Sequence, residues 1–79
     1  MQRGTLYFSD KCPDTAPFVA ALQENGIPYN KVNITDSMAN LKQFLALRDS
    51  RPEFTERKAR GMVGVPVIHL PNDELLFEL

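Results

Sequence analysis

Apolar residues recur along the chain at two spacings, one typical of strands and one typical of helices. Residues 5–9 are β-branched and aromatic, which predicts a buried strand near the start. A helix is expected to begin near Pro13 and to end near Asn25, because apolar residues follow at helical spacing and a glycine comes after Asn25. Residues 29–34 alternate loosely between apolar and polar side chains and predict a second strand.

The second half of the chain repeats these signals. Residues 38–48 keep the spacing of an amphipathic helix, and 50–53 resembles a capping box that opens a short third helix closed by Gly61. Residues 65–70 predict a strand, a three-residue turn follows, and 75–79 predict a final strand that forms an antiparallel hairpin with the one before.

This order of elements predicts an α/β fold. Two parallel strands joined by a right-handed crossover, completed by the hairpin, give a four-stranded mixed sheet flanked by helices. Residues 1–79 have room for a single domain. The loop around Cys12 then lies at the carboxyl end of the first strand, where ligands of open α/β sheets bind.

Composition excludes several classes of protein. The net charge is −1, which lacks the basic footprint of a nucleic-acid binder. No apolar run is long enough to span a membrane, and the first residues lack a signal-peptide pattern. One cysteine excludes an internal disulfide, and Cys12 and His69 are too few for a structural metal site. We expect a cytoplasmic monomer without a bound metal.

Cys12 is the candidate for chemistry. It precedes Pro13 at a helix start, where unpaired backbone N–H groups stabilise a thiolate, and Lys11 adds a cation. Asp10 and Asp14 oppose this effect. A small, inert, buried cysteine is an equally weighted interpretation.

Val65 and Pro66 carry a second, weaker signal. A cis bond between them would leave the N–H and carbonyl of Val65 free to pair with a peptide-like ligand. An ordinary trans proline at the start of an edge strand is the alternative.

Together, Cys12-Pro13-Asp14-Thr15 and Gly64-Val65-Pro66 resemble the glutaredoxins of the thioredoxin superfamily, and in particular the short bacterial glutaredoxin-related proteins. The resemblance covers essentially the whole chain. It implies a thioredoxin-like, glutaredoxin-like domain over 1–79 that lacks the usual C-terminal helix, which in glutaredoxins binds the γ-glutamyl end of glutathione.

The resemblance also implies roles for residues. Cys12 would be the nucleophilic thiolate, Val65 would hydrogen bond to the cysteine unit of glutathione, and Pro66 would be cis and face Cys12. Thr15 stands where dithiol members have a resolving cysteine, so a second glutathione would have to release the mixed disulfide. The Thr15 hydroxyl either bonds the Cys12 sulfur or is a plain helix-start hydroxyl, and Lys11 and Pro13 complete this side of the expected substrate site.

An arginine-rich stretch, 48–60, is longer than the usual connection in that family. We expect Arg48 or Arg51 to contact a carboxylate of glutathione and so replace the missing helix. A merely solvated set of charges is the alternative. Tyr7 and Phe8 are expected in the core, and no role is assigned to His69.

The leading hypothesis is a glutathione-linked thiol-disulfide oxidoreductase that acts on protein–glutathione mixed disulfides by a monothiol mechanism. Its partners would be glutathione, as co-substrate, and glutathionylated proteins. An alternative is a carrier in which two protomers and two glutathione molecules hold one [2Fe–2S] cluster. A redox-inactive binding module of the same fold is the third hypothesis.

Overall fold

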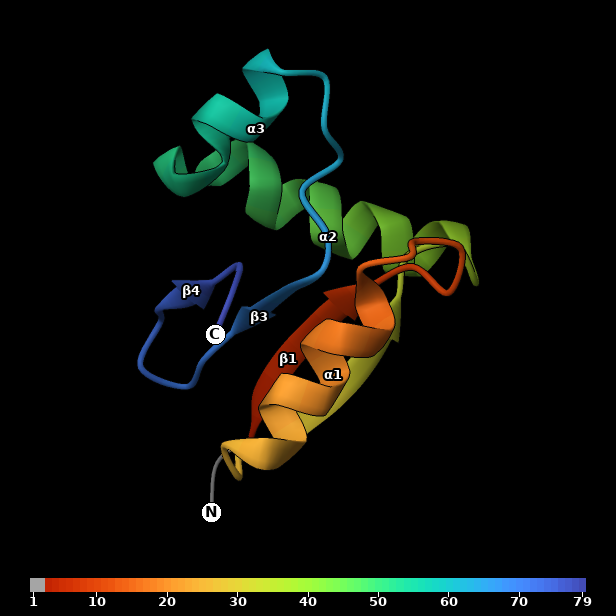
Figure 1. The fold of residues 1–79 in the computed structure, drawn as a ribbon. Helices are drawn as coiled ribbons and strands as arrows, with labels where there is room; N and C mark the ends of the chain where they lie inside the picture. The colour runs from red at the N-terminus through yellow and green to blue at the C-terminus, as the bar shows by residue number, and fades with distance from the viewer. Residues whose placement is uncertain (1–2) are drawn as a thin grey trace.

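Four short strands form one mixed sheet in the order β2-β1-β3-β4. The computed structural model describes residues 3–79, and Figure 1 shows their course. The elements, in chain order, are β1 (Gly4–Phe8), α1 (Thr15–Glu24), β2 (Tyr29–Asn33), α2 (Met38–Ser50), the 3₁₀ turn η1 (Pro52–Phe54), α3 (Thr55–Ala59), β3 (Val67–His69) and β4 (Leu75–Leu76).

The sheet has the mixed topology that the sequence predicts. β1 runs parallel to β2, whereas β3 is antiparallel to both β1 and β4. Tyr7, near the end of β1, pairs with Val67 at the start of β3. The loop that leaves β1 and the loop that enters β3 therefore meet at one end of the sheet. These two loops carry Cys12 and Val65.

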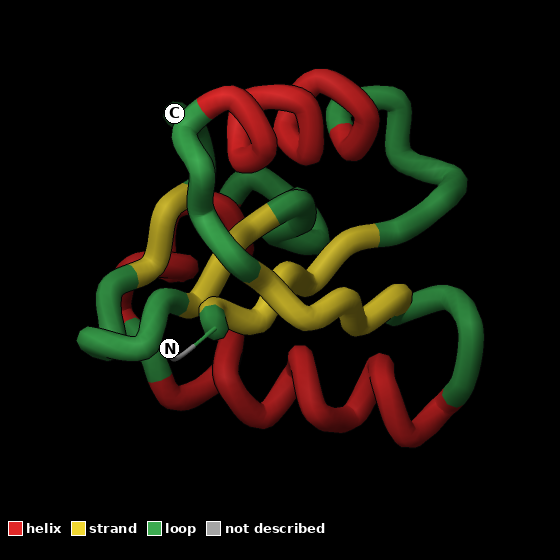
Figure 2. Tube along the Cα trace, turned by 90° about the horizontal axis from the view of Figure 1, so that it is seen from below, coloured by secondary structure: helices red, strands yellow, loops and turns green. Residues whose placement is uncertain are grey.

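Side chains of the central strands alternate between two apolar layers. The layer between the sheet and α1 has as its buried members Leu6, Phe18, Leu22 and Ile68. The layer on the opposite face, under α2 and η1, has Tyr7, Ile34, Phe44, Phe54 and Val67. Figure 2 shows the resulting arrangement, with helices on both sides of the strands. Burying each large apolar side chain contributes roughly 1.5–3 kcal/mol, so these layers hold the two loops in place.

The first helix begins later than the sequence predicts. Pro13 lies in a turn, and the first helical residue is Thr15, whose N–H donates to the carbonyl of Cys12 at 3.2 Å. Proline in a turn costs no hydrogen bond, because it has no N–H to satisfy. The predicted end near Asn25 is confirmed, since Asn25 caps the helix.

The predicted capping box of the third helix is wrong. The hydroxyl of Ser50 donates to the carbonyl of Leu47, and Glu53 pairs with Arg51 instead of reaching back to a backbone N–H. Without the box the chain forms a 3₁₀ turn that leads into the short α3. Both carboxylate oxygens of Glu53 accept hydrogen bonds from the guanidinium of Arg51, in a bidentate pair.

The C-terminal hairpin is confirmed, but its strands are shorter than predicted. β4 covers two residues, and 77–79 follow it outside any strand. Phe77 leaves the ladder because its ring packs edge-on against Phe54, with centroids 5.1 Å apart. Among residues 3–79 no helix is long and apolar enough to cross a membrane.

Candidate functional site

Cys12 is held by a tight turn between β1 and α1. Its N–H donates to the carbonyl of Ser9 at 3.1 Å, and the hydroxyl of Thr15 donates to the same carbonyl at 2.7 Å. Ser9 is buried. These two bonds fix the loop from both sides, so that the half-buried Cys12 lies at the mouth of α1.

The sulfur of Cys12 lies 4.0 Å from the carbonyl oxygen of Val65. The peptide bond between Val65 and Pro66 is cis, as expected. Within residues 3–79 no backbone hydrogen bond engages the N–H of Val65. The structure therefore brings Cys12, Val65 and Pro66 together and leaves the backbone of Val65 available to an extended ligand.

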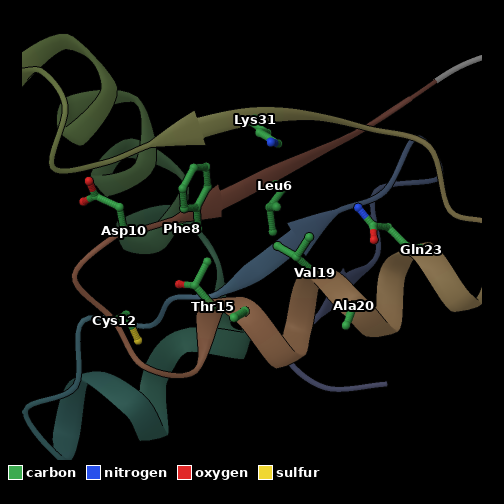
Figure 3. Close-up of a pocket in the computed structure, with 10 residues that line it drawn as sticks. Leu6, Phe8, Asp10, Cys12, Thr15, Val19, Ala20, Gln23 and Lys31 are labelled. Atoms are coloured by element: carbon green, nitrogen blue, oxygen red, sulfur yellow. The ribbon is translucent and has the colours of Figure 1, made fainter.

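A pocket of about 410 Å³ opens on one side of Cys12. Figure 3 shows it between α1 and the strands β1 and β2. Its lining residues are Leu6, Phe8, Asp10, Cys12, Thr15, Ala16, Val19, Ala20, Gln23 and Lys31. We call this the α1–β2 pocket.

A second hollow, of about 380 Å³, lies on the other side, next to Val65 and Pro66. Arg57 lines it and lies over the ring of Phe77, 3.5 Å from the ring centroid. Asp14 and Glu78 are the acidic residues in its lining. We call this the Val65 groove.

Neither arginine that we expected at the ligand lies in these hollows. Arg51 forms ion pairs with Glu53, at 2.6 Å, and with Asp73, at 2.8 Å. Arg48 donates to the carbonyl of Val63 at 3.4 Å. Both guanidinium groups thus join parts of the fold, and the structure does not bring them to Cys12.

The other expected site residues are close in sequence to Cys12. The ammonium of Lys11 lies 4.0 Å from the carboxylate of Asp10 and is largely exposed. Pro13 is exposed in its turn. The hydroxyl of Thr15 donates to a backbone carbonyl, which agrees with its interpretation as a helix-start hydroxyl.

Asp10 places a negative charge near Cys12. Its carboxylate accepts a hydrogen bond of 2.9 Å from the hydroxyl of Thr35, and this bond lowers the pKa of Asp10 below its ordinary value. Asp10 is therefore ionised at neutral pH. The helix mouth and Lys11 oppose its effect on a thiolate of Cys12.

The two aromatic residues of β1 differ in position: one lies in the core and the other lines the site. Tyr7 is buried as expected, and its hydroxyl accepts a hydrogen bond from Gln43 at 3.2 Å. Phe8 is half-buried and lines the α1–β2 pocket, so the expectation of a core position holds only in part. His69 contacts Asp73 at 2.7 Å, which gives it a structural partner away from Cys12.

Sequence reasoning missed two cations of the site. Arg57 belongs to the arginine-rich stretch that it identified, but nothing local distinguishes Arg57 from Arg51. Lys31 lies opposite Leu6 in the parallel ladder and therefore points to the same face of the sheet. The alternation of β2 was a signal for this position, although a weak one.

The metal donors of the chain do not form a site. No group of three or more His, Cys, Asp or Glu side chains within residues 3–79 is placed to hold a metal ion. One protomer offers a single thiolate, whereas a [2Fe–2S] cluster needs about four protein or ligand thiolates. A cluster would therefore need thiolates from outside this chain.

The sequence is similar to that of a bacterial protein. An uncharacterized protein of Haemophilus influenzae (strain ATCC 51907 / DSM 11121 / KW20 / Rd) is 47% identical over 79 residues, which are 100% of this chain and 92% of that protein. No protein-family profile matches the sequence. No solved structure matches it either.

Proposed function

We propose that this chain, which belongs to the same family as the uncharacterized Haemophilus influenzae protein, is a thiol-disulfide oxidoreductase that removes glutathione from protein mixed disulfides. The observation that carries this function is the approach of the Cys12 sulfur to the Val65 carbonyl, 4.0 Å apart, between two hollows. A nucleophile beside a backbone segment whose N–H is free suits a peptide-like disulfide, which can pair with that N–H.

The fold supports the same function. A mixed sheet in the order β2-β1-β3-β4, with one parallel pair, is consistent with a thioredoxin-like fold. We therefore assign this chain to the thioredoxin-like fold as part of the proposed function. In that fold the cysteine loop and the proline loop lie at the same end of the sheet, as the loops of Cys12 and Pro66 do here.

In the first step the thiolate of Cys12 attacks the glutathione sulfur of a protein–S–S–glutathione disulfide. A Cys12–S–S–glutathione bond forms, the disulfide bond between the protein sulfur and the glutathione sulfur breaks, and the protein leaves as a thiolate that takes a proton from water. The N–H of Val65 donates a hydrogen bond to the carbonyl of the glutathione cysteine. This bond aligns the two sulfurs of the mixed disulfide with the attacking sulfur of Cys12.

In the second step the thiolate of another glutathione attacks the glutathione sulfur bound to Cys12. Glutathione disulfide forms and the Cys12 thiolate is released, so that each turnover consumes one free glutathione, converts one mixed disulfide to the protein thiol and yields one glutathione disulfide. Thr15 cannot form a disulfide, so no intramolecular route competes. Arg57, in the Val65 groove, is the cation that we assign to a carboxylate of glutathione.

Turnover of a glutathionylated peptide, with glutathione, glutathione reductase and NADPH, tests this function. We expect activity in the wild type and its loss in Cys12→Ser, together with a Cys12–glutathione adduct in the intact mass of the wild type. Circular dichroism of Cys12→Ser checks that the variant is folded. Equal rates in both proteins, or no activity and no adduct in the wild type, would overturn the assignment and favour a binding module.

A further inference from the structure

The α1–β2 pocket has a construction of its own, which the glutathione mechanism does not use. Helix α1 buries Phe18 and Leu22 on the sheet, whereas the spacing of Ala16, Val19, Ala20 and Gln23 places a second stripe along its flank. Two alanines in this stripe leave space that larger side chains would fill. The pocket follows from this choice of small residues.

The floor of the pocket is apolar and one end is reactive. Leu6 and Phe8, on alternate positions of β1, face α1 from below. Its volume of about 410 Å³ lies in the range of small-ligand sites. Figure 3 shows Cys12 and Gln23 at opposite ends, so a ligand that lies along the pocket has one end at the sulfur.

Charged side chains around this pocket favour one orientation of an anionic ligand. Lys31 extends from β2 over Leu6 and forms no ion pair with any residue in the described part of the chain. Asp10, nearer to Cys12, accepts a hydrogen bond from Thr35 and stays ionised. A carboxylate is therefore repelled from the Cys12 end and attracted to Lys31, over Leu6.

The length of the pocket sets the length of the ligand. From Thr15 to Gln23 the helix rises about 12 Å, at roughly 1.5 Å per residue. The side chain of Lys31 covers part of this distance. The part that remains between Lys31 and Cys12 suits a short alkyl chain with a sulfur at one end and a carboxylate at the other.

We propose that the α1–β2 pocket binds a low-molecular-weight thiol compound, in its disulfide form, with an alkyl chain that lies on Phe8 and Val19 and a carboxylate at Lys31. The pocket differs from the Val65 groove, so this site accepts a substrate other than glutathione. The pocket proposal rests on the nucleophilic Cys12 of the proposed function and on no other part of that function.

The probe is the 2-pyridyl disulfide of 6-mercaptohexanoate. The Cys12 thiolate attacks the sulfur of the alkyl thiol, a Cys12–alkyl disulfide forms, and pyridine-2-thione leaves with the electron pair of the broken bond. Release of the thione gives the rate without glutathione or turnover. The neutral 6-mercaptohexanol and the shorter 3-mercaptopropanoate, as the same disulfides, are the matched probes.

We expect saturable labelling by the hexanoate probe, faster at low concentration than by either matched probe. The carboxylate contributes about two- to fivefold and each buried methylene up to about fourfold. Lys31→Gln removes the advantage of hexanoate over hexanol, and Ala20→Trp fills the pocket and removes saturation. Lys42→Gln, on exposed α2, is the control and keeps wild-type rates.

A small neutral probe, the 2-pyridyl disulfide of 2-mercaptoethanol, reports the intrinsic reactivity of Cys12, and the rates of each protein with the other probes are divided by its rate with this one. Labelling that does not depend on the chain, the carboxylate, Lys31 or Ala20 would overturn the pocket assignment. That result leaves glutathione turnover untouched. A reactive Cys12 with selective labelling but no glutathione turnover would instead support the pocket and overturn the function proposed above.

Discussion

The sulfur of Cys12 and the carbonyl oxygen of Val65 lie 4.0 Å apart, although 53 positions separate the two residues in the sequence. The contact joins the loop that leaves β1 to the loop that enters β3, and those strands are neighbours in the sheet. It therefore depends on both loops.

Gly64 supports the Val65 side of the contact. Its φ is +105°, and a Cβ there would lie 3.0 Å from Cδ1 of Phe54. We expect Gly64→Ala to lower the free energy of unfolding by roughly 2–4 kcal/mol and to slow the reaction of Cys12 with disulfides. Urea unfolding and thione release measure the two effects.

Gly26→Ala is the matched control. Its φ is +66°, but a Cβ there meets nothing within 4 Å. We expect a loss of about 1 kcal/mol, from the backbone conformation alone, and an unchanged rate at Cys12. Equal losses in the two variants would show that the contact with Phe54 contributes nothing.

Thr15 supports the Cys12 side. Thr15→Val keeps the shape of the side chain but removes its hydrogen bond of 2.7 Å to the Ser9 carbonyl. We expect stability to fall by about 0.5–1.5 kcal/mol, and Cys12 to react with less selectivity between probes, because its loop is held by one bond fewer. Thr55→Val, at the exposed start of α3, is the control. Unchanged selectivity in Thr15→Val would contradict this role.

Arg57 is the cation of the Val65 groove. Arg57→Gln is expected to raise the KM for glutathione about fivefold, which corresponds to about 1 kcal/mol for one partly exposed ion pair. Arg57→Lys keeps the charge and should restore most of the affinity, whereas loss of packing on Phe77 alone would affect both variants alike. Arg60→Gln, which breaks an exposed pair with Glu56, should leave KM unchanged.

Asp73 gives the stability of the fold a dependence on acid pH. Its hydrogen bond with His69 and its ion pair with Arg51 lower the pKa of Asp73, and Arg51 also lowers the pKa of Glu53. A lowered pKa in the folded state stabilises the protein above the unfolded pKa, near pH 4, and this contribution is lost as pH falls through the folded value.

Thermal unfolding between pH 7 and pH 2 tests this dependence. Asp73→Asn should be less stable than the wild type at pH 7, and the two curves should converge below about pH 4. Asp36→Asn, an exposed change in the turn before α2, should run parallel to the wild type. Parallel curves for Asp73→Asn would mean that the ion pairs around it do not stabilise the fold.

The order of the elements could be predicted because the signals for it are local. Prolines and glycines mark the ends of the helices, and apolar spacing separates helix from strand. The mixed sheet then followed from the lengths of the connections. The pairing of Cys12 with Val65 was also foreseeable, through a resemblance that joined two weak local signals.

The choice among the arginines could not be predicted in this way. Arg51 is occupied because the turn between β3 and β4 places Asp73 against it, and that placement depends on the whole hairpin. Arg57 is available because Phe77 leaves the ladder and turns back under it. Lys31 enters the site through its register with Leu6, to which only the loose alternation of β2 pointed.

The two loops of the site are attached to the interior strands β1 and β3, whereas β2 and β4 are the edges. Edge strands fray first, because one side of each has no hydrogen-bonded neighbour. The ladder between β3 and β4 joins only two residue pairs, so its amides should exchange with solvent deuterium early. The β1–β3 ladder should exchange late, which means that the outer hairpin can open and close without separating Cys12 from Val65.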